Sequence, residues 1–383
     1  MREEGHHMSD RKRRWRLLRR LLRGFITRRF HLEAERLIPP GPCLIIANHV
    51  TNWDPLLLAM SFPETPIRFV ASEHIFRHGL VSKLLDWLAA PIPRKKAASG
   101  ADTVMTVLRA LKAGDTVCIF AEGDAAWDGL THPVFPATGK LARMAGVPLL
   151  TYRLEGGYLS MPRWSGKLRR GKVRGHQIGF YPPEDLKSLK GPEITAMIDR
   201  DLYEDAFARQ RIEHVAYRAE KRAEGIERGF FICPQCGELG HTLGVGNYVL
   251  CACGMRLFYT EEGFFDPAAP VETLAEWESV QQEALRKLCE GAQDALFSDP
   301  DMRLREITAG HKQRTLGRGT LTMLPDAITL AGRRFSLADI DSMAMVKAHI
   351  LLFSADERYY EIRTESDRCL RKYLMAWQII KNR

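Results

Sequence analysis

His49 and Asp54 are separated by four residues, at a point where one apolar segment gives way to another. Leu44 to Ala47 form an apolar run short enough for a buried strand, and Asp54-Pro55 has the signature of a helix start with the aspartate at the N-cap. Across such a turn the two side chains can meet. An imidazole held by a carboxylate suits a general base, and the alternative is a helix cap beside a polar loop residue.

Residues 31–225 alternate strand-like and helix-like segments, the pattern of an α/β domain. We expect strands at 43–47, 67–71, 116–120 and 147–153, and helices at 55–61, 79–89, 101–113 and 136–145. A long polar helix is expected from Ile194 to Glu224. Two of the strands end on ionisable residues, His49 and Glu122. Ligands bind at that edge of an open α/β sheet, so we expect the chemistry there.

Three further segments of this domain carry residues suited to chemistry. Pro91 to Lys96 is a proline-fixed loop that holds the cations Arg94, Lys95 and Lys96. Val117 to Asp124 is a buried strand that ends on Glu-Gly-Asp. Residues 141–150 form a helix, a glycine stop and a strand.

Together with the histidine segment, and in this order, these segments resemble the glycerolipid acyltransferase family, typified by 1-acyl-glycerol-3-phosphate acyltransferase. The resemblance covers roughly residues 40–155 and rests on Asn48-His49 with Asp54, on Arg94, on Phe120-Glu122-Gly123 and on Gly146-Val147-Pro148. The family's third motif usually reads Phe-Pro-Glu-Gly-Thr-Arg. This chain has Phe120-Ala121-Glu122-Gly123-Asp124-Ala125 and lacks the arginine, which leaves the acceptor headgroup open.

The resemblance implies transfer of a fatty acyl group from a thioester, acyl-CoA or acyl-ACP (acyl carrier protein), to a hydroxyl of a lysophospholipid such as 1-acyl-glycerol-3-phosphate. In that reaction His49 takes the hydroxyl proton and Asp54 orients the imidazole. The residues expected to bind substrate are Asn48, Arg94, Lys95, Glu122 and Gly123. The alternatives are a non-glycerol acceptor, or a non-catalytic lipid- or protein-binding scaffold with an acyltransferase fold.

The net charge of +9 is concentrated in residues 11–29, which carry ten Lys/Arg and no acidic residue. Residues 10–30 read as an amphipathic helix with Trp15, leucines and Phe25 opposite arginines. This pattern predicts that residues 1–30 dock on anionic phospholipid at the cytoplasmic face of a membrane. The alternatives are a helix packed on its own domain, or nucleic-acid binding, which the continuous apolar face disfavours. No transmembrane helix is expected, because apolar stretches of about 18 residues are missing. No secretory signal is expected either, because the N-terminal segment is rich in arginine rather than apolar.

Four of the eight cysteines form two close pairs, Cys233 with Cys236 and Cys251 with Cys253, separated by 14 residues. Their spacing predicts a zinc ribbon over residues 226–265, with one structural zinc bound by four thiolates and no catalytic role. A redox pair or an iron site is the alternative. The remaining cysteines lack the layout of a secreted disulfide framework, which favours a reducing compartment.

The rest of the chain is expected to hold a helical linker at 266–302 and a small barrel at 303–383. Short alternating strands are expected at 320–324, 327–330, 334–337, 349–353 and 359–362, and a closing helix at about 366–381. This arrangement resembles a pleckstrin-homology (PH) domain, a class that binds lipids or proteins; a structural role is the alternative. We therefore predict a multidomain chain with an α/β acyltransferase domain, a zinc ribbon and an α+β PH-like domain.

Overall fold

The computed structural model describes residues 2–72, 90–94, 101–266, 269–308, 313–364 and 368–382. The chain divides into two compact units. The first ends at Arg218, and the second runs from Ala219 to Arg383 and also includes Arg163–Lys167.

The first unit is built on a seven-stranded sheet in the order β1-β7-β6-β2-β5-β3-β4. Its strands are β1 (Leu32–Ala34), β2 (Leu44–Ala47), β3 (Ile67–Ser72), β4 (Ile92–Arg94), β5 (Thr116–Phe120), β6 (Leu149–Glu155) and β7 (Val173–Tyr181). β2 pairs in parallel with β5 and β6, and β3 pairs in parallel with β4 and β5. The carboxyl ends of these five strands therefore lie at one edge of the sheet.

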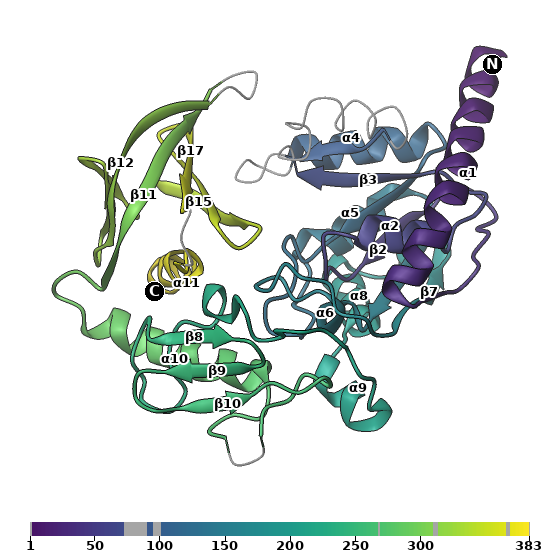
Figure 1. The fold of residues 1–383 in the computed structure, drawn as a ribbon. Coiled ribbons are helices and arrows are strands. Elements are labelled where there is room, and N and C mark those ends of the chain that lie inside the picture. The colour runs from purple at the N-terminus through teal and green to yellow at the C-terminus, as the bar shows by residue number, and fades with distance from the viewer. Residues whose placement is uncertain are drawn as a thin grey trace. The chain divides into compact units, whose positions relative to one another are not determined.

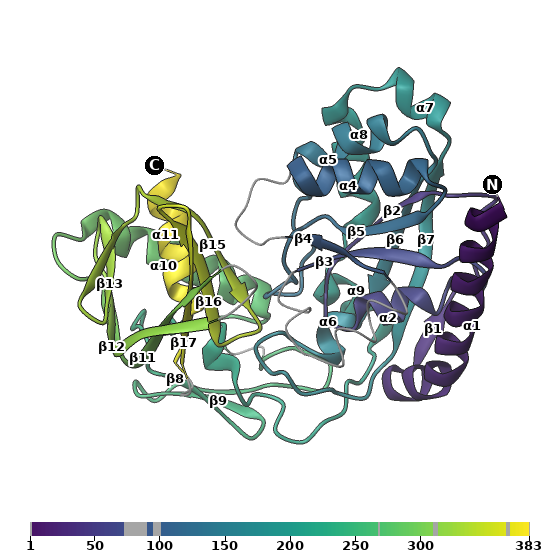
Figure 2. The ribbon, with the colours of Figure 1, turned by 90° about the horizontal axis from the view of Figure 1, so that it is seen from above.

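Helices cover both faces of this sheet. They are α1 (Arg2–Phe30), α2 (Asp54–Ala59), α4 (Ala101–Lys112), α5 (Ala137–Ala145), α6 (Gly157–Ser160), α7 (Pro183–Ser188), α8 (Gly191–Leu202) and α9 (Ala206–Glu213). α4, α5 and α8 lie on one face, as Figure 2 shows, and α2 lies on the other. Under α4, α5 and α8 an aliphatic core joins helix residues such as Val107 and Ile194 to strand residues such as Ile46 and Val117.

The apolar runs predict β2, β3, β5, β6, α2, α4 and α5 to within two residues. They do not predict α6, α7 or the two short strands β1 and β4, and one expected long helix differs. β1 and β4 have three residues each, too few for a periodic signal. The single helix expected from Ile194 to Glu224 is wrong, because α8 ends at Leu202 and α9 is capped anew by Asp205. The helix expected at 79–89 lies outside the described residues.

One stripe of α1 packs against the first unit. Trp15, Ile26 and Phe30 are buried, and the Trp15 indole N–H donates to the Phe62 carbonyl oxygen at 2.8 Å. The Arg19 guanidinium also donates to two carbonyl oxygens, of which that of Ala59 lies at 2.7 Å. The helix is therefore tied to its own domain, as one of the alternative readings predicts.

A second apolar stripe of α1 stays in solvent. Leu17, Leu21 and Phe25 follow one another at intervals of four residues, so they share one face of the helix. Their side chains are 53%, 70% and 52% exposed. Of the apolar half predicted from the sequence, only part is therefore used for packing.

The second unit contains two antiparallel sheets and two long helices (Figure 1). The small sheet consists of β8 (Thr242–Val245), β9 (Tyr248–Cys251) and β10 (Arg256–Phe258), and a short 3-10 helix, η2 (Ile226–Arg228), precedes it. α10 (Leu274–Gly291) follows, as the sequence predicts. Its Trp277 is fully buried, and the indole donates to the Ile232 carbonyl oxygen at 2.7 Å.

The large sheet has the order β14-β13-β12-β11-β17-β16-β15 and confirms a sheet-rich C-terminal region. Its strands are β11 (Phe297–Ile307), β12 (Gln313–Met323), β13 (Ala327–Leu330), β14 (Arg333–Ser336), β15 (Ile340–Val346), β16 (Ile350–Ala355) and β17 (Arg358–Arg363). The sequence pattern misses β15 and begins the region too late, because β11 starts before residue 303. α11 (Arg371–Lys381) follows the last strand.

Buried ion pairs fasten α11 within the second unit. Arg371 Nη2 lies 2.6 Å from Glu278 Oε1, and both side chains are buried. Lys372 pairs with Asp299 at 2.7 Å, and the Tyr373 hydroxyl donates to the same carboxylate at 2.8 Å. Removing one member would leave its partner charged and buried, so these contacts fix α11 against α10 and β11.

Candidate active site

The loop that carries His49 is held by the buried carboxylate of Asp54. His49 Nδ1 lies 2.7 Å from Asp54 Oδ2, and the Val50 amide donates to the same oxygen at 2.7 Å. Asp54 Oδ1 accepts from the Thr51 amide at 3.0 Å and from the Thr51 hydroxyl at 2.7 Å. The expected N-cap at Asp54 is wrong by one residue, since Trp53 holds that position. The carboxylate closes the preceding loop instead.

The imidazole of His49 is oriented by contacts on two sides. Its ring stacks on Phe120, the last residue of β5, with centroids 4.8 Å apart and planes at 28°. A carboxylate at Nδ1 favours the tautomer with the proton on that nitrogen, so Nε2 carries the lone pair. The side chain is 22% exposed. The His49 ring is therefore held in one tautomer and remains partly exposed.

Asn48 joins the end of β2 to the neighbouring strand β6. Its amide nitrogen donates to the Leu154 carbonyl oxygen at 2.9 Å, and its amide oxygen accepts from the Leu154 N–H at 2.7 Å. The side chain is fully buried. Asn48 thus fixes the backbone directly before His49 to β6, and its contact with substrate stays a prediction.

Glu122 connects the His49 loop to a second loop. Its Oε1 accepts from the His49 backbone amide at 2.6 Å, and its Oε2 accepts from the His132 backbone amide at 2.9 Å. Burial raises the pKa of Glu122 to about 7, and the two amide hydrogen bonds oppose this shift. The glutamate of the Glu-Gly motif therefore organises the backbone on both of its sides.

Gly123 leaves room for an aromatic ring that also contacts Arg94. With a φ of +81°, Gly123 has a conformation that L side chains rarely adopt, and an added Cβ would lie 2.4 Å from Phe135 Cζ. The Arg94 guanidinium carbon lies 4.9 Å from the centroid of the same ring. Burial lowers the pKa of Arg94. Lys95, the next expected substrate residue, lies outside the described residues.

The expected residues thus meet at the carboxyl edge of the sheet, and three others join them. His49, Asp54, Glu122 and Gly123 share one connected cluster, and Arg94 reaches it through Phe135. Sequence reasoning overlooks Phe135, His132 and Asp128. All three lie in the loop between β5 and α5. An aspartate and a histidine four residues apart, Asp128 and His132, are the sequence signal that could have pointed to this loop.

Trp53 links this site to the end of α1. Its ring centroid lies 6.1 Å from that of Phe25 and 5.7 Å from that of Phe30. Trp53 directly precedes Asp54 in the chain. The exposed apolar stripe of α1 therefore ends beside the loop that holds His49.

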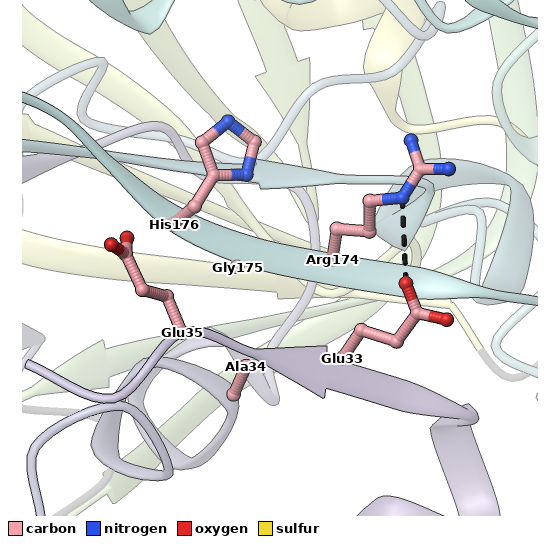
Figure 3. A pocket seen from close by; sticks show the side chains of 6 residues that line it. All are labelled: Glu33, Ala34, Glu35, Arg174, Gly175 and His176. Carbon is pink, nitrogen blue, oxygen red and sulfur yellow. Dashed lines mark ion pairs between the residues drawn. The ribbon is translucent and has the colours of Figure 1, made fainter.

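An open pocket of about 310 Å³ lies elsewhere on the sheet, between β1 and β7 (Figure 3). It is lined by Glu33, Ala34, Glu35, Arg174, Gly175 and His176. Arg174 faces Glu33 across it, with 3.6 Å between Nε and a carboxylate oxygen. His49 is not part of its lining. We therefore locate the candidate site by its side-chain chemistry rather than by this hollow.

The four paired cysteines of the second unit form a separate cluster. Their sulfur atoms all lie within 4.8 Å of one another. The sulfur–sulfur distance is 3.9 Å both between Cys233 and Cys253 and between Cys236 and Cys251. Four sulfurs at about 2.3 Å around a tetrahedral ion lie roughly 3.8 Å apart, so the cluster could bind a metal.

Glycines shape both turns of this cluster. Gly237 has a φ of +76° and Gly254 a φ of +92°. Their amides donate to the carbonyl oxygens of Cys233 and Cys251 at 2.9 and 3.0 Å. Each turn folds back on the first cysteine of its pair.

Residues 29–155 match the family model described as Acyltransferase. This segment is therefore an acyltransferase-family domain, which confirms the resemblance seen in the motifs. It contains His49, Asp54, Arg94 and Glu122. The match does not extend to the cysteine cluster or to the C-terminal sheet.

Two curated relatives are each named probable 1-acyl-sn-glycerol-3-phosphate acyltransferase. The protein of Mycoplasma genitalium is 30% identical over 128 residues, which are 32% of this chain and 47% of the relative. That of Mycoplasma pneumoniae is 26% identical over 149 residues, 37% of this chain and 55% of the relative. The chain thus spans about half the length of the curated relatives it matches.

A solved structure, the 1-acyl-sn-glycerophosphate (LPA) acyltransferase PlsC from Thermotoga maritima, aligns with a TM-score of 0.43 and 18% identity. The alignment covers 53% of this chain and 80% of that one.

Replacing Glu122 by glutamine should change how stability depends on pH. Because the folded pKa of about 7 lies above the ordinary glutamate value, the native state binds more protons than the unfolded state between the two values. The parent protein therefore loses unfolding free energy as pH rises through that interval, and Glu122→Gln removes this loss. Calorimetric unfolding temperatures of the variant should rise relative to the parent from about pH 5 to about pH 8. A difference that stays constant with pH would contradict the assignment.

Proposed function

We propose that this protein is an O-acyltransferase that moves a fatty acyl group from acyl-CoA or acyl-ACP to a hydroxyl of a lysophospholipid, such as 1-acyl-glycerol-3-phosphate. The observation that carries the proposal is the 2.7 Å contact of His49 Nδ1 with the buried Asp54 carboxylate, at the edge where five parallel strands end. The family match and the names of the curated relatives support the reaction and the acceptor.

His49 acts as the general base of this reaction. Its Nε2 takes the proton of the acceptor hydroxyl as that oxygen attacks the thioester carbonyl carbon. Asp54 stabilises the imidazolium that forms. When the tetrahedral intermediate collapses, the carbon–sulfur bond breaks and the leaving thiolate takes the proton back from Nε2. The transfer thus needs no acyl group on the protein.

The residues around the base hold the acceptor in this proposal. Arg94, with Lys95, binds a phosphate oxygen, since a guanidinium suits that geometry. Glu122 and the Gly123 backbone position the glycerol part, and Asn48 keeps the end of β2 in register. The ring of Phe135 sets the direction of the Arg94 side chain.

His49→Ala should lower acyl transfer by about 10²- to 10⁴-fold, because the proton acceptor is lost. Asp54→Asn should also reduce turnover, since the amide no longer favours the required tautomer. Product formation from radiolabelled acyl-CoA or acyl-ACP and a panel of lysophospholipids measures both effects. His176→Gln, a histidine beside Glu155 outside this cluster, serves as the matched control and should retain activity. Parent-like turnover in His49→Ala would refute the mechanism.

We further propose that α1 docks the protein on anionic phospholipid at the cytoplasmic face of a membrane. The exposed stripe of Leu17, Leu21 and Phe25 is flanked by exposed arginines such as Arg20 and Arg28. Apolar side chains beside cations suit the headgroup boundary of a bilayer. None of the helices in the described ranges is long and apolar enough to cross a membrane.

Replacing Leu17, Leu21 and Phe25 together by glutamine should weaken binding to anionic vesicles at least about tenfold, because about 1.5–3 kcal/mol of apolar burial is lost per side chain. Co-sedimentation with phosphatidylglycerol vesicles at low and high salt measures this vesicle binding. Ile212→Gln removes an apolar side chain that is 82% exposed on α9 and should leave binding unchanged. Equal binding of the triple variant and its parent would place the lipid contact elsewhere.

In the second unit we propose one structural zinc bound by Cys233, Cys236, Cys251 and Cys253. The sulfur separations support a tetrahedral site, and four protein ligands leave no position for catalysis. We also propose that the β-rich region at 303–383 is PH-like, since seven antiparallel strands precede one closing helix. The domains proposed from the sequence are 1–30, 31–225, 226–265, 266–302 and 303–383.

Purified protein should contain about one zinc per chain, as four thiolates form one closed site. Elemental analysis measures the metal. Cys233→Ser combined with Cys236→Ser should abolish it and lower the unfolding temperature of the second unit. Cys289→Ala, outside the cluster, should keep the zinc. A stable protein free of metal would contradict this site.

A further inference from the structure

The small sheet formed by β8, β9 and β10 presents a set of mostly apolar side chains on one face. Its register joins the three strands in two rows of directly opposed residues. Side chains of opposed residues, and of residues two apart in one strand, point to the same side of a sheet. We call these six residues the outer face of the small sheet: Leu243, Leu250 and Arg256 in one row, and Val245, Tyr248 and Phe258 in the other.

The outer face is exposed although five of its six side chains are aliphatic or aromatic. Leu243, Val245 and Phe258 are 49%, 48% and 38% exposed. Tyr248 and Leu250 between them are half-buried. Because the register places these residues side by side, they form one contiguous patch rather than scattered surface positions. A contiguous apolar patch is a signature of an interaction site.

The opposite face of the small sheet is committed to packing. Val249 and Leu257 are buried there. A Cβ added to Gly244 on that side would lie 1.9 Å from the Ala223 carbonyl oxygen, and the Gly244 amide donates to Glu227 Oε2 at 3.0 Å. The sheet therefore rests directly on its own chain, and this packing leaves the outer face turned to solvent.

The charge on the outer face is positive. None of its six residues is acidic, and the exposed Arg256 holds its guanidinium carbon 4.2 Å from the centroid of the Tyr248 ring. A second arginine, Arg222, lies beside the face, with its guanidinium carbon 5.7 Å from the Phe258 centroid. Arg222 pairs with Glu261 at 3.6 Å, so Arg256 is the cation that the outer face itself offers to a partner.

Two kinds of occupant fit the outer face poorly. Single-stranded nucleic acid stacks its bases on free aromatic rings in a basic groove, whereas guanidinium groups already lie over Tyr248 and Phe258 and three of the six residues are aliphatic. A second copy of the chain would need more surface, because a stable protein interface takes roughly 20–30 residues a side.

We propose that the outer face of the small sheet docks on an anionic phospholipid surface. Leu243, Val245 and Phe258 enter the headgroup boundary, and Arg256 lies among the lipid phosphates. Apolar and aromatic side chains beside an arginine suit that boundary. A bilayer sets no minimum interface size, since each apolar side chain that enters it adds its own burial. This contact is separate from that of α1 and does not depend on acyl transfer.

Replacing Leu243, Val245 and Phe258 together by threonine should weaken binding of the full chain to phosphatidylglycerol vesicles at least about tenfold. Threonine keeps the preference for strands, so β8 and β10 persist. Co-sedimentation measures the loss, which should recur when α1 already carries Leu17→Gln, Leu21→Gln and Phe25→Gln. As matched control, Val280→Gln with Leu288→Gln removes two side chains of α10 that are 39% and 38% exposed and should leave binding unchanged.

The charge of Arg256 is tested separately from burial. Arg256→Gln should weaken binding to phosphatidylglycerol vesicles about fivefold, the effect of one cation at an anionic surface, and leave binding to phosphatidylcholine vesicles unchanged. Arg256→Lys keeps the charge and should bind both kinds of vesicle as the parent does.

Hydroxyl-radical footprinting tests the contact in the unaltered protein, where no substitution can disturb folding. Oxidation of the Leu243 and Phe258 side chains should fall when phosphatidylglycerol vesicles are added. Oxidation of Val280 should stay as it is without lipid.

Three results would overturn the assignment. The first is parent-like vesicle binding by the threonine variant in both α1 backgrounds, or oxidation of Leu243 and Phe258 that lipid leaves unchanged. The second is self-association of the parent without lipid that the threonine variant abolishes, because a second copy would then cover the face. The third is an equal loss of binding in the α10 control, which would show that the effect is not specific to the outer face.

Discussion

The buried carboxylate of Asp54 sets the geometry on which the candidate site depends. A charge without access to water is tolerable only when hydrogen bonds replace its hydration, and here the donors come from three consecutive residues, His49, Val50 and Thr51. The same hydrogen bonds therefore fix both the conformation of the loop and the orientation of the His49 imidazole. Loss of the carboxylate would free the ring and also leave backbone amides unpaired. The parallel sheet places His49 at its carboxyl edge, and the Asp54 carboxylate sets the direction in which the imidazole points.

Much of this arrangement could be predicted from the sequence, since the signals are local. Apolar runs such as Leu44 to Ala47 mark the buried strands, and a histidine and an aspartate across a strand–helix turn are expected to meet. What could not be predicted depends on contacts between distant segments. Phe135 matters because its ring fills the space beside Gly123 and lies against Arg94. No local sequence pattern predicts that these three residues come into contact.

The same distinction explains the errors in the helices. A polar helical pattern from Ile194 onward carries no sign that the chain breaks after Leu202, because the break depends on Asp205 capping a new helix and pairing with Leu130 in another loop. For α1 the sequence periodicity shows that one half of the helix is apolar. It does not show which of the two apolar stripes packs against the domain. Trp15 is held by a carbonyl group of a segment some fifty residues away, whereas Leu21 is left exposed.

If α1 docks on a membrane as proposed, the contact of Trp53 with Phe25 and Phe30 has a kinetic consequence. An α1 that rests on lipid through its exposed stripe would hold the loop of His49 at a constant height above the bilayer, since one packed ring joins the two. The acceptor would then be drawn from a two-dimensional solution, and its mole fraction in the membrane would control the rate rather than its amount per volume. Adding inert lipid would slow such an enzyme by surface dilution, even when every reactant is kept constant.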